Sequence, residues 1–112
     1  MGEEVAMGEV ITGGLEQSRW IATGIAGIDY AVLREENGGA TIFVRMAKGT
    51  HGPMHLHPAG EELYVVGGEV TCGGQRLKAG DYLYTPPGAS HDIDAHADST
   101  LFVSLPQRAV FL

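Results

Sequence analysis

The chain has 112 residues, 44% of them hydrophobic, which is enough for one domain with one core. Its formal net charge of −7 argues against binding to nucleic-acid phosphates, because such binding requires clustered cations. No apolar run approaches the roughly 20 residues of a membrane helix, so no membrane partner is expected.

The N-terminal segment is rich in Gly and Glu and weakly patterned. Residues 1–22 are interpreted as a loose arm that can add an edge strand, and residues 23–112 as the folded domain. Residues 1–10 carry three Glu and no cation, so they do not resemble a signal peptide. The single cysteine, Cys72, cannot form an internal disulfide. Together these features predict a cytoplasmic protein.

From Ile28 onward the chain consists of short strand-like runs separated by Gly and Pro turns. The runs 29–35 and 40–46 flank Asn37-Gly38, which is a strong hairpin signal between two such runs. Further runs are expected at 62–66, 69–72, 75–77, 82–85, 91–94, 100–105 and 110–111. Because no segment has helical periodicity, the sequence predicts an all-β sandwich or small barrel.

Three histidines and one acidic residue form a pattern typical of a metal-binding site. His55 and His57 are separated by one residue, so they project from the same face of an extended chain. Glu61 opens the next strand, and His91 follows a Pro-Pro-Gly turn 30 residues later. Three imidazoles and a carboxylate are suitable ligands for a divalent first-row metal. The spacing alone does not bring His91 to the other three residues.

The glycines around these residues complete two signature motifs. The first runs Gly49, five residues, His55, one, His57, three, Glu61, six, Gly68; the second runs Gly80, five residues, Pro86, one, Gly88, two, His91. In both motifs the chain resembles the cupin superfamily. The resemblance implies a single-domain, all-β jelly-roll barrel, also called a double-stranded β-helix, over residues 23–112. It also implies a metal near the barrel mouth, held by His55, His57, Glu61 and His91. Where the family often has Asn, this chain has Ala95, at a structural position.

The segments 57–62, 79–83 and 86–91 resemble two cupin groups more closely. One is the ChrR-type anti-sigma-factor group, and the other cleaves acetylacetone and similar diketones with iron. The implied function is that of a small metal-dependent enzyme that acts on a compact chelating organic substrate. The first choice of reaction is that of a dioxygenase. A cupin isomerase or lyase, and a zinc-binding sensor or ligand-binding module without catalysis, are the alternatives. The implied cofactor is one divalent transition metal per chain, which could be Fe, Zn, Mn or Ni.

Three residues near the motifs have competing interpretations. If Glu62 were the ligand in place of Glu61, the apolar residues of its strand would turn to the opposite face and the glycine spacing would break. Arg45 interrupts an apolar strand. Its side chain either faces outward along the barrel or binds an anionic substrate. Cys72 has no cationic neighbour in sequence and is predicted to be packed, not nucleophilic.

The expected assembly is a homodimer, both by family resemblance and because an open jelly roll leaves edge strands to cover. The arm carries the apolar residues Val10, Ile11, Trp20 and Ile21, so it is too apolar to be a free tail. It is therefore expected to cap the partner's sheet across a two-fold axis, with an arm folded on its own barrel as the alternative. Most of the aromatic residues are expected in the core or in this interface.

Overall fold

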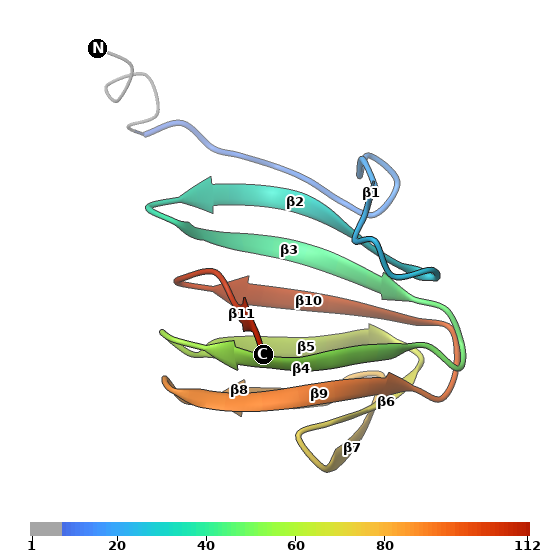
Figure 1. Ribbon diagram of the computed structural model, residues 1–112. Helices are drawn as coiled ribbons and strands as arrows, with labels where there is room; N and C mark the ends of the chain where they lie inside the picture. Colours follow the sequence, from blue (N-terminus) through green and yellow to red (C-terminus); the bar gives the residue numbers. More distant parts are fainter. Residues whose placement is uncertain (1–7) are drawn as a thin grey trace.

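The computed structural model describes residues 8–112, and its regular structure is entirely β (Figure 1). Eleven strands occur within these residues: β1 (Ile21–Ala22), β2 (Ile28–Glu36), β3 (Gly39–Met46), β4 (His51–His57), β5 (Glu61–Gly67), β6 (Glu69–Cys72), β7 (Gln75–Lys78), β8 (Tyr82–Thr85), β9 (Ala89–Ala95), β10 (Ser99–Leu105) and β11 (Val110–Phe111). They form a six-stranded sheet, β1-β2-β3-β10-β5-β8, and a five-stranded sheet, β11-β4-β9-β6-β7. The predicted all-β jelly-roll fold is confirmed, with the ladders confined to the two facing sheets.

The local turn chemistry explains why the strands begin and end where they do. Asn37 and Gly38 have φ angles of 51° and 82°, so both central residues of the β2–β3 hairpin lie in the left-handed region, as the predicted hairpin requires. The four glycines of the two motifs also have left-handed φ angles, at Gly49 (86°), Gly68 (88°), Gly80 (94°) and Gly88 (87°). The motif glycines therefore mark the corners of the fold.

At the N-terminus, β1 pairs with β2 as the edge strand of the six-stranded sheet. The rest of the described arm has no strand, and Val10 and Ile11 are exposed. Residues 1–7 of the predicted arm lie outside the described residues. Between 8 and 112, no helix has the length and apolar character needed to cross a bilayer.

The core lies between the two sheets and follows strand alternation. On β5 the even-numbered side chains face outward, while Leu63 and Val65 are buried beside Glu61. The buried hydrophobic cluster consists of aliphatic side chains and one cysteine: Ile28, Met46, Leu63, Val65, Val70, Cys72, Leu77, Ile93, Ala95, Leu101 and Val103. Burying one such large aliphatic side chain contributes about 1.5–3 kcal/mol, so this cluster supplies the main driving force for folding.

Four of the aromatic side chains lie on the outer surface. Tyr64, Tyr82, Tyr84 and Phe102 are exposed on the outward side of the six-stranded sheet, where β5, β8 and β10 are neighbours. Of the two places expected for the aromatic residues, the core and a dimer interface, the core is excluded for these four, since the buried cluster is aliphatic apart from one cysteine. Their place in a dimer interface stays a prediction.

Candidate metal centre

A β-bulge in β4 decides which histidines face the interior. β4 pairs with β9 through Gly52 opposite Ile93 and His55 opposite His91, so three steps along β4 match two along β9. One extra residue in a strand shifts the alternation of its side chains. His51, which precedes the bulge, is exposed, and His55 and His57 turn inward. Without this bulge His51, His55 and His57 would share one face.

The four predicted ligands converge at one point between the sheets. The centroids of the His55, His57 and His91 rings are 4.7 Å apart in every pair. The Glu61 carboxylate lies 3.3 Å from His57 Nε2 and 3.4 Å from His91 Nε2, and these two nitrogens are 3.1 Å apart. One donor atom from each of the four residues lies within 4.8 Å of the others. The structure thus brings His91 to the residues of the first motif.

The neighbouring carboxylate, Glu62, points the other way. It is exposed and accepts a hydrogen bond of 2.7 Å from the Tyr82 hydroxyl on the outer surface. Glu61 is only 6% exposed and lies on the buried face of β5. Strand alternation therefore separates the two adjacent acids, and only Glu61 faces the imidazoles.

Hydrogen bonds behind the cluster orient two of the rings. His55 Nδ1–H donates to the Pro53 carbonyl at 2.7 Å, and His91 Nδ1 lies 3.1 Å from the Thr85 hydroxyl oxygen. These contacts direct the Nε2 atoms of both rings toward the centre, as in protein metal sites. His57 Nδ1 and Glu61 Oε1 are buried without a hydrogen-bond partner among the described residues. Since buried polar atoms are normally satisfied, their state fits a site that binds a further group.

Burial also sets the protonation of the cluster. It is the largest cause that lowers the pKa of both His57 and His91 to about 4, and the Coulomb effect of the nearby His55 imidazole adds to it. Burial raises the pKa of Glu61 to about 8. At neutral pH both imidazoles are neutral and offer lone pairs, while Glu61 keeps a proton that a metal ion would replace. The donor set therefore fits a divalent first-row metal.

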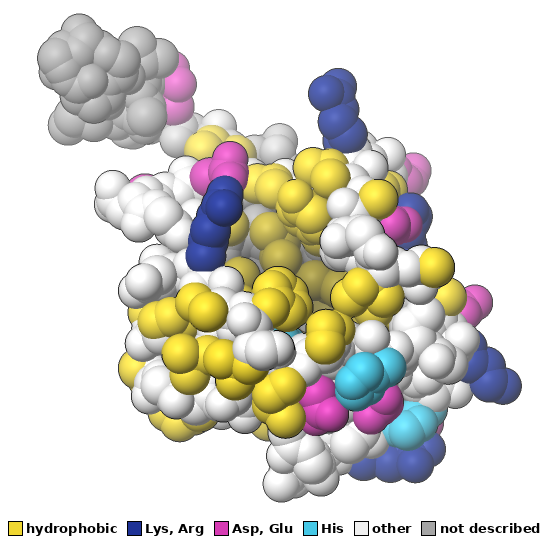
Figure 2. All heavy atoms as spheres, in the orientation of Figure 1, with side chains coloured by type: hydrophobic (Ala, Val, Ile, Leu, Met, Phe, Trp, Pro, Cys, Tyr) yellow, Lys and Arg dark blue, Asp and Glu magenta, His cyan; other side chains and the backbone are white. Residues whose placement is uncertain are grey.

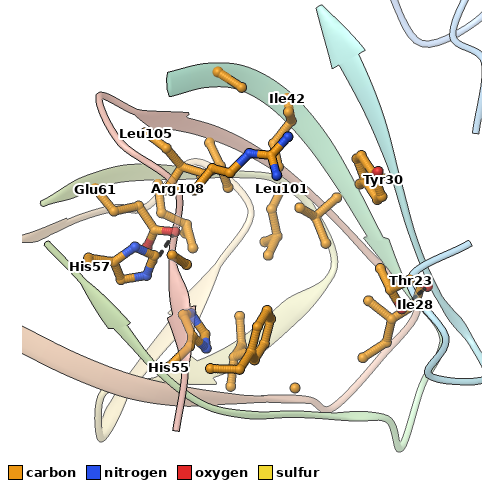
Figure 3. A pocket seen from close by; sticks show the side chains of 18 of the residues that line it. Thr23, Ile28, Tyr30, Ile42, His55, His57, Glu61, Leu101, Leu105 and Arg108 are labelled. Atoms are coloured by element: carbon orange, nitrogen blue, oxygen red, sulfur yellow. Dashed lines mark hydrogen bonds and ion pairs between the residues drawn. The ribbon is translucent and has the colours of Figure 1, made fainter. Parts of the chain in front are cut away.

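The cluster lines a cavity of about 640 Å³ between the sheets. Figure 2 shows the hollow with hydrophobic side chains around it, and Figure 3 shows His55, His57 and Glu61 facing into it. Most of the wall is aliphatic, with Ile28, Ile42, Val44, Met46, Leu63, Ile93, Leu101, Val103 and Leu105. Polar side chains join this lining at Thr23, Tyr30, Glu35 and Arg108. A cavity of this size and character suits a small organic molecule.

Arg45 lies outside this cavity. Its guanidinium is 3.1 Å from the Asp29 carboxylate and 4.1 Å from the centre of the Trp20 ring, on the surface of β2 and β3. The arginine that lines the cavity is Arg108, which was not among the residues predicted from the sequence. Arg108 follows Pro106 in the connection before β11, outside both motifs, so only its charge within an apolar C-terminal segment marks it in the sequence.

Cys72 and a surface cluster of one histidine and two aspartates are not part of the cavity lining. Cys72 is buried, and its burial, together with the Glu61 and Asp92 carboxylates, raises the pKa of the thiol to about 12. This confirms the prediction of a packed, unreactive cysteine. Asp92, Asp94 and His51 gather on the outer face of β4 and β9, where His51 Nδ1 is 2.7 Å from Asp94.

Two facing β-sheets with three histidines and one glutamate gathered between them define the chain as a cupin. The family model described as the ChrR Cupin-like domain matches residues 9–109, so the chain belongs to this cupin family. No curated protein matches the chain in sequence.

Solved structures agree with this fold. An RmlC-like cupin from Shewanella frigidimarina is 27% identical, with a TM-score of 0.76 and coverage of 89% of this chain and 93% of the other. An acetylacetone dioxygenase from Acinetobacter johnsonii is 16% identical, with a TM-score of 0.80 and coverage of 93% and 77%. The complex of Rhodobacter sphaeroides SigE with the anti-sigma ChrR matches at 23% identity and a TM-score of 0.73, over 82% of this chain but only 50% of that one. The last two likenesses show the fold alone.

Proposed function

We propose that this cupin is a metal-dependent dioxygenase acting on a compact, chelating organic molecule such as a 1,3-dicarbonyl compound. The observation that carries the proposal is the convergence of three imidazoles and one carboxylate on an apolar cavity of about 640 Å³. The fold shared with the Acinetobacter johnsonii acetylacetone dioxygenase supports the reaction class.

In this proposal His55, His57, Glu61 and His91 hold one divalent ion, which could be Fe, Zn, Mn or Ni. Such an ion would act as a Lewis acid on two chelating oxygens of the substrate and, if redox-active, would support chemistry with dioxygen. The aliphatic walls offer few hydrogen-bond partners to water, so electrostatic interactions within the cavity are stronger than in bulk water. Thr85 and the Pro53 carbonyl hold two of the imidazoles in place.

The second candidate is a zinc-binding sensor or ligand-binding module without catalysis. It is favoured by the family match, since the matching model describes the ChrR cupin-like domain. Four protein ligands can close a tetrahedral zinc shell, and such a site is structural. A third possibility on the same site is a cupin isomerase or lyase, which would use only the Lewis-acid part of the chemistry.

Anaerobic reconstitution with Fe(II), followed by measurement of oxygen uptake, separates the dioxygenase from the candidates that do not use dioxygen. We expect uptake with at least one member of a panel of diketones, thiols and catechols, and loss of uptake in Glu61→Ala. The matched control is Glu62→Ala, which removes the adjacent exposed carboxylate and should retain activity. Tight retention of zinc with no oxygen uptake from any compound would instead support the binding module.

We further propose that the protein is a homodimer. The exposed aromatic side chains of β5, β8 and β10, together with the apolar arm residues Val10 and Ile11, are surfaces that a second copy would cover. An isologous contact would place the same patch of both subunits on the two-fold axis. The small-molecule partner enters the cavity, so it does not compete with this surface.

The proposed location is the cytoplasm. Cys72 is buried and unpaired within residues 8–112. A protein whose one thiol stays free suits a reducing compartment. Fractionation of the source cells, followed by immunodetection, tests this location directly, and recovery outside the cytoplasmic fraction would contradict it.

A further inference from the structure

The C-terminal residues 106–112 form a strap that connects the two sheets beside the cavity. The strap leaves β10 of the six-stranded sheet and joins the five-stranded sheet through β11, which pairs with β4. The Arg108 amide donates to the Gly38 carbonyl at 3.2 Å, and the Leu112 amide donates to the Met54 carbonyl at 3.2 Å. Both ends of the strap are therefore fixed by backbone hydrogen bonds, one to each sheet.

Gly39 allows the strap to lie against the β2–β3 hairpin. A Cβ atom at this position would be 2.4 Å from the carbonyl oxygens of both Leu105 and Pro106. Real Cβ atoms do not come so close to backbone oxygens, so any larger residue would displace the strap. The position of Arg108 thus follows from close backbone packing and not from a loose end of the chain.

Arg108 is the cation of the cavity. Among the described residues that line the cavity, it is the only Lys or Arg. Arg34, Arg45 and Arg76 each form an ion pair with a carboxylate. No carboxylate of residues 8–112 lies within ion-pair distance of the Arg108 guanidinium, and this includes Glu35, which lines the same cavity. Within the part of the chain that the structure describes, its donors therefore have no carboxylate partner and can bind a ligand.

The other groups of the cavity lie in a definite arrangement around this guanidinium. Figure 3 shows the Arg108 side chain reaching over the cavity toward Ile42, in a direction away from Glu61. Aliphatic side chains make up most of the remaining lining. The cavity therefore offers three environments to one molecule: a metal-ligating cluster, an apolar wall and a guanidinium.

We propose, on the basis of the proposed function, that the substrate is a small organic carboxylate whose chelating oxygens and carboxylate group lie at opposite ends of an apolar body. The chelating end would meet the His and Glu cluster, and the carboxylate would meet Arg108. A guanidinium presents paired N–H donors that match the two oxygens of a carboxylate. Glu35 carries the opposing charge in this part of the lining, so it weakens anion binding.

Calorimetric titration of the zinc-loaded protein tests this assignment without relying on turnover. The ligands are 1,3-diketones with a terminal carboxylate, such as 4,6-dioxoheptanoate and its homologues with shorter and longer spacers, and the methyl ester of each. Charge-assisted hydrogen bonds predict that the best carboxylate binds about tenfold more tightly than its ester. Arg108→Gln should abolish this preference and leave ester binding unchanged, whereas Glu35→Gln should increase it. Arg45→Gln, at an arginine outside the cavity, is the matched control and should behave like the wild type.

Metal content and thermal unfolding are measured for each variant, so that a lost metal or a damaged fold is recognised. Equal binding of acid and ester by the wild type, or an unchanged preference in Arg108→Gln, overturns the assignment of Arg108 and leaves the proposed function intact. Failure of every diketone, acid or ester, to bind the zinc-loaded protein overturns the proposed function and this inference with it.

Discussion

The buried acid of the candidate metal centre is expected to make the metal-free protein sensitive to alkaline pH. Burial raises the pKa of Glu61 from 4.5 to about 8, so the folded chain keeps a proton that the unfolded chain has already lost. The stabilisation is complete below the unfolded pKa and is lost as the pH rises through the folded pKa. Substitution by Gln removes this ionisation and nearly conserves the shape of the side chain. Stability should therefore fall with rising pH in the wild type more steeply than in Glu61→Gln.

The size of the effect follows from proton linkage. One proton difference corresponds to about 1.4 kcal/mol for each pH unit. Between about pH 6.5 and pH 8 the unfolded carboxyl is ionised throughout, whereas the folded one ionises only near its pKa of about 8. The free energy of unfolding of the wild type should thus fall by about 1.5 kcal/mol relative to Glu61→Gln. For a domain of this size the difference in Tm between the two proteins should change by about 6 °C.

The assay is thermal and urea unfolding of both proteins in a chelator at several pH values. The two lowered histidine pKa values contribute equally to both proteins, so they cancel in the comparison. Glu62→Gln, which changes an exposed carboxylate, should follow the wild type. Parallel stability curves for wild type and Glu61→Gln would refute the reasoning, because they would mean that Glu61 is already ionised in the folded protein. Added zinc should abolish the loss of stability at alkaline pH in the wild type, since the metal replaces the proton on Glu61.

Four other predictions concern the ligands and the assembly. His57→Ala should lower metal content by at least about tenfold, as measured by elemental analysis, while circular dichroism shows an intact fold because the aliphatic core is unchanged. Glu61→Ala should strip the metal and Glu62→Ala should not; the reverse result would show that the ligand is Glu62. Light scattering should give twice the monomer mass of 11.8 kDa, and a monomer at micromolar concentration would reject the homodimer. Deletion of residues 1–22 should weaken the dimer, and a dimer that survives intact would place the interface elsewhere on the barrel.

Local sequence chemistry was enough to predict most of the strands, their turns and the face on which Glu61 lies. Asn37-Gly38 marks a hairpin because few other pairs adopt two left-handed conformations in succession. The alternation of β5 assigns Glu61 to the buried face and Glu62 to the outer face, since a strand turns each successive side chain to the opposite side. These features depend only on neighbouring residues, so they can be predicted from the sequence without knowledge of the fold.

The tertiary structure alone decided which histidines and which arginine reach the cavity. Strict alternation would place His51 on the same face as His55, and only the β-bulge opposite β9 separates them. Arg45 interrupts an apolar strand yet faces outward to Asp29, whereas Arg108 reaches the cavity because the strap packs on the hairpin. A bulge and a strap that crosses between sheets are set by pairing between residues far apart in the chain. The local pattern of residues carries no signal for such pairing.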